Sequence, residues 1–199
     1  TEKGVFSVKE SRKLLTKAKE MGFKLKMHAD EIVQLGGAEL AGELKTTSAD
    51  HLLQASDEGI KALKDNNVIA TLLPATAFSL QEDFARARYM IDNGLAVAVA
   101  SDFNPGSCHT ESIPLLIALS TIKMKMSIEE TINGLTINAA KALDRHKEVG
   151  SLEIGKKADI VIHDCPTYKF LAYHIGVNQV EKVIKNGKII LDKEIIGAL

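Results

Sequence analysis

The chain has 199 residues, of which 45% are hydrophobic and 26% are charged, a balance typical of a folded globular protein rather than a disordered one. Its 25 basic and 26 acidic residues leave no charge excess, so we expect a small-molecule partner and neither nucleic acid nor a membrane surface. No run reaches the roughly 20 apolar residues that span a bilayer, and two cysteines make no disulfide framework, which favours a cytoplasmic protein.

A helix and a short strand are predicted at the start of the chain. Ser7 is a suitable N-cap, and Glu10 follows three residues later, as in a capping box. The segment that follows predicts a helix over residues 7–21, which Gly22 ends. Residues 24–29 then alternate polar and apolar side chains, which predicts a strand.

Three further strands are predicted, over residues 46–51, 68–74 and 96–101. The last two are nearly continuous apolar runs, which is typical of strands buried on both faces. Helices are predicted between them, over residues 57–64 and 81–93. Because strands that alternate with helices form parallel sheets, this part of the chain predicts an α/β fold with half of a β/α barrel.

The chain ends with two more helices and a small β unit. The helices are predicted over residues 111–125 and 127–143, the second with another capping box at Ser127 and Glu130. Residues 158–163 predict a strand, and residues 180–191 a hairpin that turns at Asn-Gly, the dipeptide preferred in type I′ turns. The change of pattern predicts two domains: a partial barrel over residues 1–149 and a β segment over residues 150–199.

Four side chains that can bind metal or transfer protons stand at or just after predicted strand ends: His28, Glu31, His51 and Asp102. Because the carboxyl ends of barrel strands form the active site, we expect them to share one cleft. Imidazole and carboxylate ligands suit zinc or iron, and Asp102 or Glu31 would serve as general acid and base. The alternative is structural, since each could cap a helix or form an ordinary hydrogen bond, and Asp30 is a good N-cap for the segment after it.

Residues 104–107, Asn-Pro-Gly-Ser, form a predicted turn, because these residue types supply fixed and positive φ values. A turn can also bind a ligand. Gly106 lets backbone N–H groups come close to a ligand, while Asn104 and Ser107 offer hydrogen bonds to a carboxylate or amide. Cys108 follows this loop but has no basic partner fixed by spacing, so we do not predict a nucleophile there.

Several motifs occur in the order found in a known family. They are MHADEI, SADHL, SDFNPGS, TINAAKAL and GSLEIGKKADIVI, which together extend over nearly the whole chain. The sequence resembles the imidazolonepropionases of the amidohydrolase superfamily, and HADE with SDFNPGS carries the specific part of the resemblance. The resemblance implies a metal-dependent, TIM-like barrel enzyme that hydrolyses the cyclic amide 4-imidazolone-5-propanoate to N-formimidoyl-L-glutamate in histidine degradation.

The resemblance also implies roles for single residues. His28 and Asp102 would bind one divalent metal, zinc or iron. Glu31 would contact the substrate ring or the attacking water, His51 would assist the reacting carbonyl, and Asp102 would relay the proton. The substrate-binding residues would be Glu31, Asn104, Gly106 and Ser107.

The family draws two further metal ligands from a His-x-His pair on the first barrel strand, and no such pair occurs in this sequence. A complete barrel has eight strand-helix units in about 250 residues, whereas about four are predicted here. We therefore expect the C-terminal half of a barrel, whose partner is the missing N-terminal half. We expect the half alone to be inactive, to expose an unpaired sheet edge rich in apolar side chains, and to form a homo-oligomer.

Two alternative functions stay open on the sequence. Another cyclic amidohydrolase or a deaminase would share the metal chemistry but not the SDFNPGS loop. A non-catalytic binding or assembly module would be consistent with the missing His-x-His pair, and it would depend on neither His28 nor Asp102.

Overall fold

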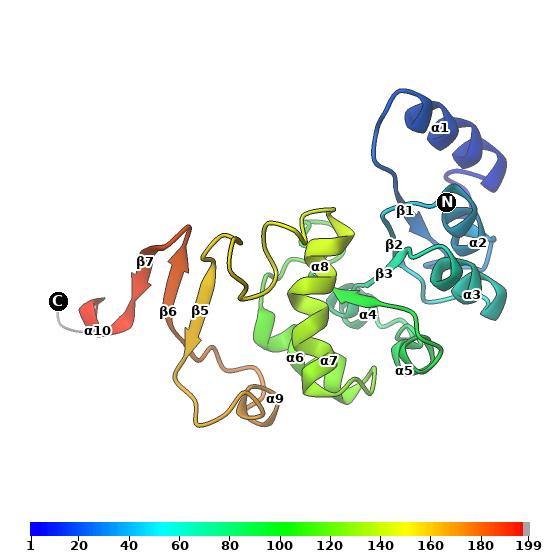
Figure 1. Ribbon diagram of the computed structural model, residues 1–199. Coiled ribbons are helices and arrows are strands. Elements are labelled where there is room, and N and C mark those ends of the chain that lie inside the picture. Colours follow the sequence, from blue (N-terminus) through cyan, green and yellow to red (C-terminus); the bar gives the residue numbers. More distant parts are fainter. Residues whose placement is uncertain (197–199) are drawn as a thin grey trace.

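The computed structural model describes residues 1–196 and contains two sheets with helices between and around them (Figure 1). The larger sheet is parallel, as predicted, and its strands follow the order β1 (Lys26–Ala29), β2 (Ser48–His51), β3 (Ile69–Leu72) and β4 (Val97–Val99). The smaller sheet is antiparallel and consists of β5 (Ile160–His163), β6 (Val180–Lys185) and β7 (Lys188–Asp192). The α/β prediction is therefore confirmed.

Helices alternate with the parallel strands, as the sequence pattern predicts. They are α1 (Val8–Glu20), α2 (Gly37–Leu44), α3 (Asp57–Asp65), α4 (Pro74–Leu80), α5 (Ala87–Asp92), α6 (Ile113–Ile122), α7 (Ile128–Leu135) and α8 (Ile137–Ala142). Two short helices, α9 (Phe170–Tyr173) and α10 (Lys193–Ile196), accompany the small sheet. No helix within residues 1–196 is long and apolar enough to cross a membrane.

Local sequence signals are confirmed where they concern caps and turns. Helix α1 begins after Ser7, whose side chain and that of Glu10 form both hydrogen bonds of the capping box. Helix α7 begins in the same way after Ser127. The hairpin between β6 and β7 turns at Asn186 (φ 50°) and Gly187 (φ 75°), two positive values that match a type I′ turn.

Two predicted helices are wrong in extent. The helix expected over residues 81–93 begins only at Ala87, because Gln81 adopts φ 59° and ends a separate helix, α4. The helix expected over residues 127–143 is interrupted at Thr136 and forms α7 and α8. Helix α2 lies outside the predicted elements, since its N-cap is Gly36, which offers no capping side chain.

The parallel sheet packs differently on its two faces. One face contributes Ala70, Leu72, Val97 and Val99 to the main core, which also contains the buried side of α2 and α3. On the opposite face, Ile69 and Ala98 form a small cluster with Ala142 of α8. Figure 1 shows α6, α7 and α8 between the parallel sheet and the small sheet.

The part of this second face that belongs to β1 and β2 carries polar side chains. Lys26 and His28 are exposed, and the Lys26 ammonium lies 3.9 Å from the Asp50 carboxylate on β2. The expectation of an apolar exposed strand is therefore wrong for β1. Its accessible side chains are polar because they alternate with Met27 and Ala29, which point into the main core.

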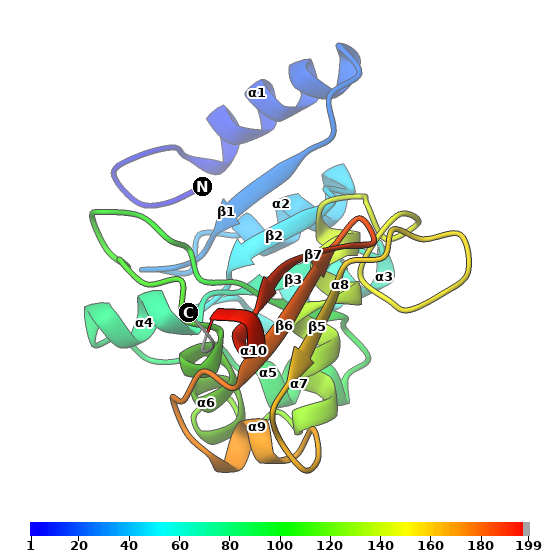
Figure 2. The same ribbon diagram turned by 90° about the vertical axis from the view of Figure 1, so that its left-hand side faces the viewer.

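Apolar exposure occurs instead on the small sheet, which lies at one end of the molecule in Figure 1 and faces the viewer in Figure 2. Exposed fractions are 49% for Val161, 41% for Ile162, 60% for Ile189 and 65% for Ile190. These side chains come from β5 and β7, so the sheet is incompletely covered. The proposed domain division between residues 1–149 and 150–199 stays a prediction.

Helices α2 and α3 pack unusually closely because each has a glycine at the contact. A Cβ atom on Gly42 would lie 2.7 Å from the backbone carbonyl of Ala62, and one on Gly59 would lie 2.7 Å from Ala38 Cβ. Real Cβ atoms do not approach neighbours so closely, so a larger residue at either position requires the helices to separate.

The start of α7 supplies a test of stability. The Glu130 carboxylate accepts hydrogen bonds from Arg88 Nη1 (2.8 Å), Arg88 Nη2 (3.0 Å) and Ser127 N (2.7 Å). The bonds from Arg88 hold the pKa of Glu130 below its usual value of 4.5 despite partial burial. Glu130→Gln should lower the free energy of unfolding at pH 7 by about 1–2 kcal/mol, measured by urea denaturation.

The pH dependence of this effect has a defined sign. A carboxylate whose pKa is lowered on folding stabilises the protein above its unfolded-state pKa and loses this effect on acidification. The difference between wild type and Glu130→Gln should therefore be constant above about pH 5.5 and shrink as the pH falls below about 4.5. Glu58→Gln, an exposed change in the first turn of α3, is the control. An equal effect of both changes, or a gap that widens in acid, would contradict the assignment.

Candidate functional site

Three strands of the parallel sheet are followed by, or end in, residues with left-handed backbone. Asp30 (φ 50°) follows β1, His51 (φ 75°) ends β2, Leu52 (φ 62°) comes next, and Asp102 (φ 54°) lies in the loop after β4. Such conformations cost roughly 1–3 kcal/mol for residues other than glycine, and they cluster at functional sites. Because the carboxyl ends of parallel strands also converge at one edge, this edge of the sheet is the candidate functional site.

His28, Glu31 and His51 come together at that edge. Glu31 Oε2 lies 3.6 Å from His28 Nε2, and Glu31 Oε1 lies 3.1 Å from His51 Nδ1. The two imidazole rings have centroids 4.5 Å apart with planes tilted by 55°. Three of the four residues expected to share a cleft are thus in direct contact.

His51 is buried and keeps its imidazole neutral. Burial, followed by the neighbouring His28, lowers the pKa of His51 from 6.5 to about 4. The residue is 7% exposed, and its Nδ1 has no hydrogen-bond partner among residues 1–196. Glu31 Oε1 is near, but that contact does not have hydrogen-bond geometry. At neutral pH, His51 therefore offers an uncharged imidazole nitrogen that has no hydrogen-bond partner in the described part of the chain.

Glu31 and Asp102 supply carboxylates to the same region. Burial raises the pKa of Glu31, and the charges of Asp102 and Glu2 act in the same direction, against His28. Asp102 accepts a hydrogen bond of 2.8 Å from the hydroxyl of Thr76, a buried residue of α4. The charge of Asp102 also acts on His51 and Glu31, but Asp102 is not one of the three residues whose ligand atoms lie close together in the described part of the chain.

The loop that carries Glu31 is fixed by two buried carboxylates. Glu2 accepts hydrogen bonds from the backbone N–H groups of Glu31 (2.9 Å), Ile32 (3.1 Å) and Val33 (3.3 Å). Burial opposes the charge of Glu2, but these bonds and one from Lys3 outweigh it and lower the pKa of Glu2. The sequence analysis missed Glu2, because its partners are about 30 residues away and no local motif marks it.

Asp30 fixes the other end of the same loop. It is fully buried, and its carboxylate accepts hydrogen bonds from the backbone N–H groups of Leu35 (2.9 Å), Gly37 (3.0 Å) and Ala38 (2.8 Å). Asp30 thus satisfies the first N–H groups of α2, as the N-cap interpretation predicts, but from seven residues before the helix rather than from the cap position.

The loop after β4 is a compact turn. The Asn104 carboxamide oxygen accepts hydrogen bonds from the N–H groups of Gly106 (2.8 Å) and Ser107 (2.8 Å), and its nitrogen donates to the Asp102 carbonyl (2.8 Å) and Ser107 Oγ (3.0 Å). The turn prediction is confirmed. Asn104 is largely occupied with holding the loop, and the proposed substrate contacts of Asn104, Gly106 and Ser107 stay a prediction.

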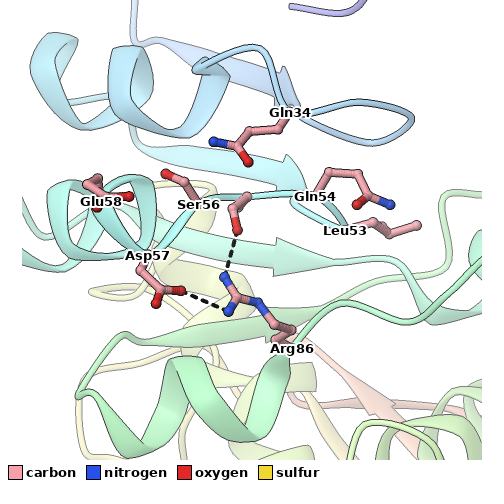
Figure 3. A pocket seen from close by; sticks show the side chains of 8 residues that line it. Gln34, Leu53, Gln54, Ser56, Asp57, Glu58 and Arg86 are labelled. Carbon is pink, nitrogen blue, oxygen red and sulfur yellow. Dashed lines mark hydrogen bonds and ion pairs between the residues drawn. The ribbon is translucent and has the colours of Figure 1, made fainter.

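An open depression of about 460 Å³ lies beside this site and not within it (Figure 3). Arg86 crosses it, donating to the Ala55 carbonyl (2.8 Å) and pairing with Asp57 (2.8 Å). Its other lining residues include Gln34 and Gln54, from the loops after β1 and β2. The predicted site residues do not line this depression, so it is separate from the strand-end cluster.

The residues at the strand ends fit a divalent metal ion. His28, Glu31 and His51 offer imidazole nitrogens and carboxylate oxygens, which are donors that zinc and iron accept. The buried, unpartnered Nδ1 of His51 is the kind of atom that a bound ion would satisfy.

Comparison with known proteins identifies the family of the chain. The sequence model described as "Amidohydrolase family" matches residues 2–190. The chain belongs to the amidohydrolase family. It is 66% identical over 192 residues to an imidazolonepropionase of Clostridium tetani, covering 96% of this chain and 46% of that protein. A Porphyromonas gingivalis imidazolonepropionase is 58% identical over 190 residues, covering 96% and 45%. The chain thus spans about half the length of the curated relatives it matches.

Solved structures show the same fold for this amidohydrolase chain. An adenosine deaminase from Xanthomonas campestris with bound zinc superposes with a TM-score of 0.80 at 19% identity, covering 96% of this chain and 52% of that one. A 5-methylcytosine deaminase from Klebsiella pneumoniae gives a TM-score of 0.77 at 19% identity, covering 93% and 52%. The chain has the architecture of half an amidohydrolase barrel with a small antiparallel sheet, as predicted.

Asp30 gives a stability test for this amidohydrolase chain. Asp30→Ala removes a buried acceptor and leaves the N–H groups of Gly37 and Ala38 without it, so the free energy of unfolding should fall by about 2–3 kcal/mol. Urea denaturation followed by circular dichroism measures the change. Asp65→Ala, at the exposed end of α3, is the control and should cost below about 1 kcal/mol. Equal losses in the two variants would show that Asp30 does not hold α2.

Proposed function

We propose that this chain forms half of an imidazolonepropionase, which hydrolyses 4-imidazolone-5-propanoate to N-formimidoyl-L-glutamate in histidine degradation. The observation that carries the proposal is the 66% identity to the Clostridium tetani imidazolonepropionase over nearly the whole chain. The contact between His28, Glu31 and His51 supports the proposal. Metal-dependent hydrolysis in a β/α barrel requires imidazole and carboxylate groups together at the carboxyl edge of the sheet.

One divalent ion, zinc or iron, would be held by His28 and Asp102 together with ligands from the remaining half of the protein. Both residues lie at the carboxyl edge of the sheet, and both donor types suit either metal. When bound, such an ion polarises a carbonyl group and lowers the pKa of water. The zinc in the Xanthomonas campestris deaminase supports a zinc-like ion without deciding between the two metals.

The chain's own side chains would then handle the protons. His51 is uncharged at neutral pH because its pKa lies at about 4, so it can donate a hydrogen bond to the ring carbonyl oxygen without carrying a charge. Glu31 has a raised pKa, which suits a group that contacts the ring or the attacking water. Asp102 would accept the proton of that water.

In the proposed reaction, one C–O bond forms and one C–N bond breaks. The water oxygen bonds to the ring carbonyl carbon, the C–N bond of the ring breaks, and the proton carried by Asp102 goes to the departing nitrogen. Glu31, Asn104, Gly106 and Ser107 would orient the substrate, the last three from the turn after β4. Because the Asn104 side chain already organises that turn, its contribution includes the shape of the loop.

The remaining half of the barrel would be the first partner. It would pair with the edge of the parallel sheet and bring the His-x-His pair that the family resemblance implies. We also propose that the exposed edge allows self-association and gives a homo-oligomer. A cytoplasmic location is proposed as well.

Complementation tests the function directly. The purified 199-residue chain, supplied with zinc or iron, should show no hydrolysis of 4-imidazolone-5-propanoate. Co-expression with the remaining half of the Clostridium tetani relative should restore hydrolysis. Hydrolysis of a different cyclic amide or deamination of a nucleobase by the complex would point to another amidohydrolase activity. Full turnover by the chain alone would overturn the half-enzyme proposal.

Asp102→Asn in the complemented enzyme keeps the side-chain shape but removes the charge and the proton acceptor. Turnover should fall at least ~100-fold, the lower range for loss of general acid-base catalysis. Asp65→Asn, a carboxylate change at the exposed end of α3, is the matched control. Near-normal turnover of Asp102→Asn with metal still bound would remove Asp102 from the mechanism.

A further inference from the structure

His51 belongs to a segment of backbone that does not hold its shape unaided. His51 (φ 75°) and Leu52 (φ 62°) are consecutive left-handed residues, and neither is a glycine. Such conformations persist only where the surrounding structure fixes the chain on both sides of them. The contacts that fix this segment therefore also fix the place of the His51 ring beside that of His28.

The first part of the segment is tied to the main chain at the end of β1. The Leu52 N–H group donates to the Ala29 carbonyl (3.1 Å), and the Gln54 N–H group donates to the Asp30 carbonyl (2.9 Å). The Leu52 side chain is buried in the main core. These contacts join the segment to the strand that carries His28, but they end at Gln54.

The last part of the segment is held by a side chain from a distant part of the chain. Arg86, at the N-cap of α5, crosses the open depression, and its Nη2 donates to the Ala55 carbonyl at 2.8 Å (Figure 3). Within residues 1–196, no backbone N–H group bonds to that carbonyl. Ala55 is buried, so the carbonyl needs a partner from the protein. Arg86 therefore fixes the chain four residues after His51.

Arg86 is itself oriented by two neighbours. Its Nη1 lies 2.8 Å from Asp57 Oδ1, and its guanidinium carbon lies 4.8 Å from the centre of the Tyr89 ring. The side chains of Arg86 and Asp57 are 44% and 58% exposed, so the ion pair alone contributes little. A planar guanidinium has several fixed N–H groups and serves the carboxylate and the carbonyl together, which a single ammonium does less well. The bond to the Ala55 carbonyl is therefore the specific contact.

We propose that Arg86 is a positioning residue that holds the loop after β2 and thereby keeps the His51 ring against that of His28. Arg86 lines the depression beside the strand-end cluster and is not placed to touch the substrate. The effect on the reaction rests on the proposed function, in which His51 donates a hydrogen bond to the ring carbonyl. A displacement of about 1 Å in such a group can lower the rate about 100-fold. The effect on the position of the ring rests on the geometry alone.

NMR of the 199-residue chain tests the position of the ring. In Arg86→Ala, the nuclear Overhauser effect between the ring protons of His28 and His51 should be lost, since it depends on their present contact. The Gln54 N–H group should exchange with solvent at least about tenfold faster. Arg145→Ala removes a comparably exposed ion pair with Glu148 and is the control, which should change neither signal. An unchanged Overhauser effect with unchanged exchange in Arg86→Ala would overturn the proposal.

Kinetics of the complemented enzyme test the effect on the reaction. Arg86→Ala should lower kcat at least about tenfold and change KM less than about threefold, because the bond from His51 acts mainly in the transition state. Added guanidinium chloride should restore part of this kcat but none of the kcat lost in Asp102→Asn. If Arg86→Ala does not fold, Arg86→Lys keeps the charge beside Asp57 and should still lower kcat at least about threefold.

The outcomes separate this proposal from the proposed function. Normal kcat in both Arg86 variants would remove Arg86 from the mechanism. Inactivity of the complemented wild type would count against the proposed function, whereas the NMR comparison would still decide whether Arg86 positions His51.

Discussion

The parallel pairing of β1 with β2 is the constraint on which the strand-end cluster depends. Their register sets Ala29 opposite His51 and His28 opposite Asp50. His51 would face the main core beside Ala29 if the strand continued regularly, because side chains in paired strands alternate together. Its positive φ turns the residue out of that alternation, and its ring meets that of His28. A shift of one residue in the register would separate the two rings.

Two buried carboxylates fix the backbone of the loop that follows β1. Glu2 holds the backbone of Glu31, Ile32 and Val33, and Asp30 holds the start of α2. Neither carboxylate is paired with a lysine or arginine among the described contacts, since backbone N–H groups serve as their partners. Backbone N–H groups, and not basic side chains, therefore fix the position of the loop that carries Glu31.

Much of the fold could be predicted from the sequence because its signals are local. Capping boxes at Ser7 and Ser127 and the Asn-Gly turn each depend on a few adjacent residues, and all three are present in the structure. The wrong helix limits have a local cause that periodicity does not reveal, namely the left-handed conformation of Gln81. The cluster of His28, Glu31 and His51 could be predicted because parallel strand ends converge.

What could not be predicted depends on contacts distant in sequence. Thr76 reaches Asp102 across 26 residues, and Glu2 reaches the Glu31 loop across 29. A threonine in an apolar segment and a glutamate near a chain end carry no pattern that singles them out. The polar exposed face of β1 was likewise hidden, because alternation alone does not tell whether a polar face meets solvent or a reaction site.

The glycine contact between α2 and α3 has a consequence for how this protein could change over generations. Each helix follows a strand whose end supplies part of the cluster, and both helices pack in the main core on the face of the sheet opposite His28. Gly42 meets the backbone of Ala62, which has no flexible end that could move aside. A methyl group added there would be tolerated only with a matching loss of volume nearby. Substitutions at this helix pair should therefore arise in compensated combinations, although the nearest neighbour of Gly42 is Ala62 and not His28, Glu31 or His51.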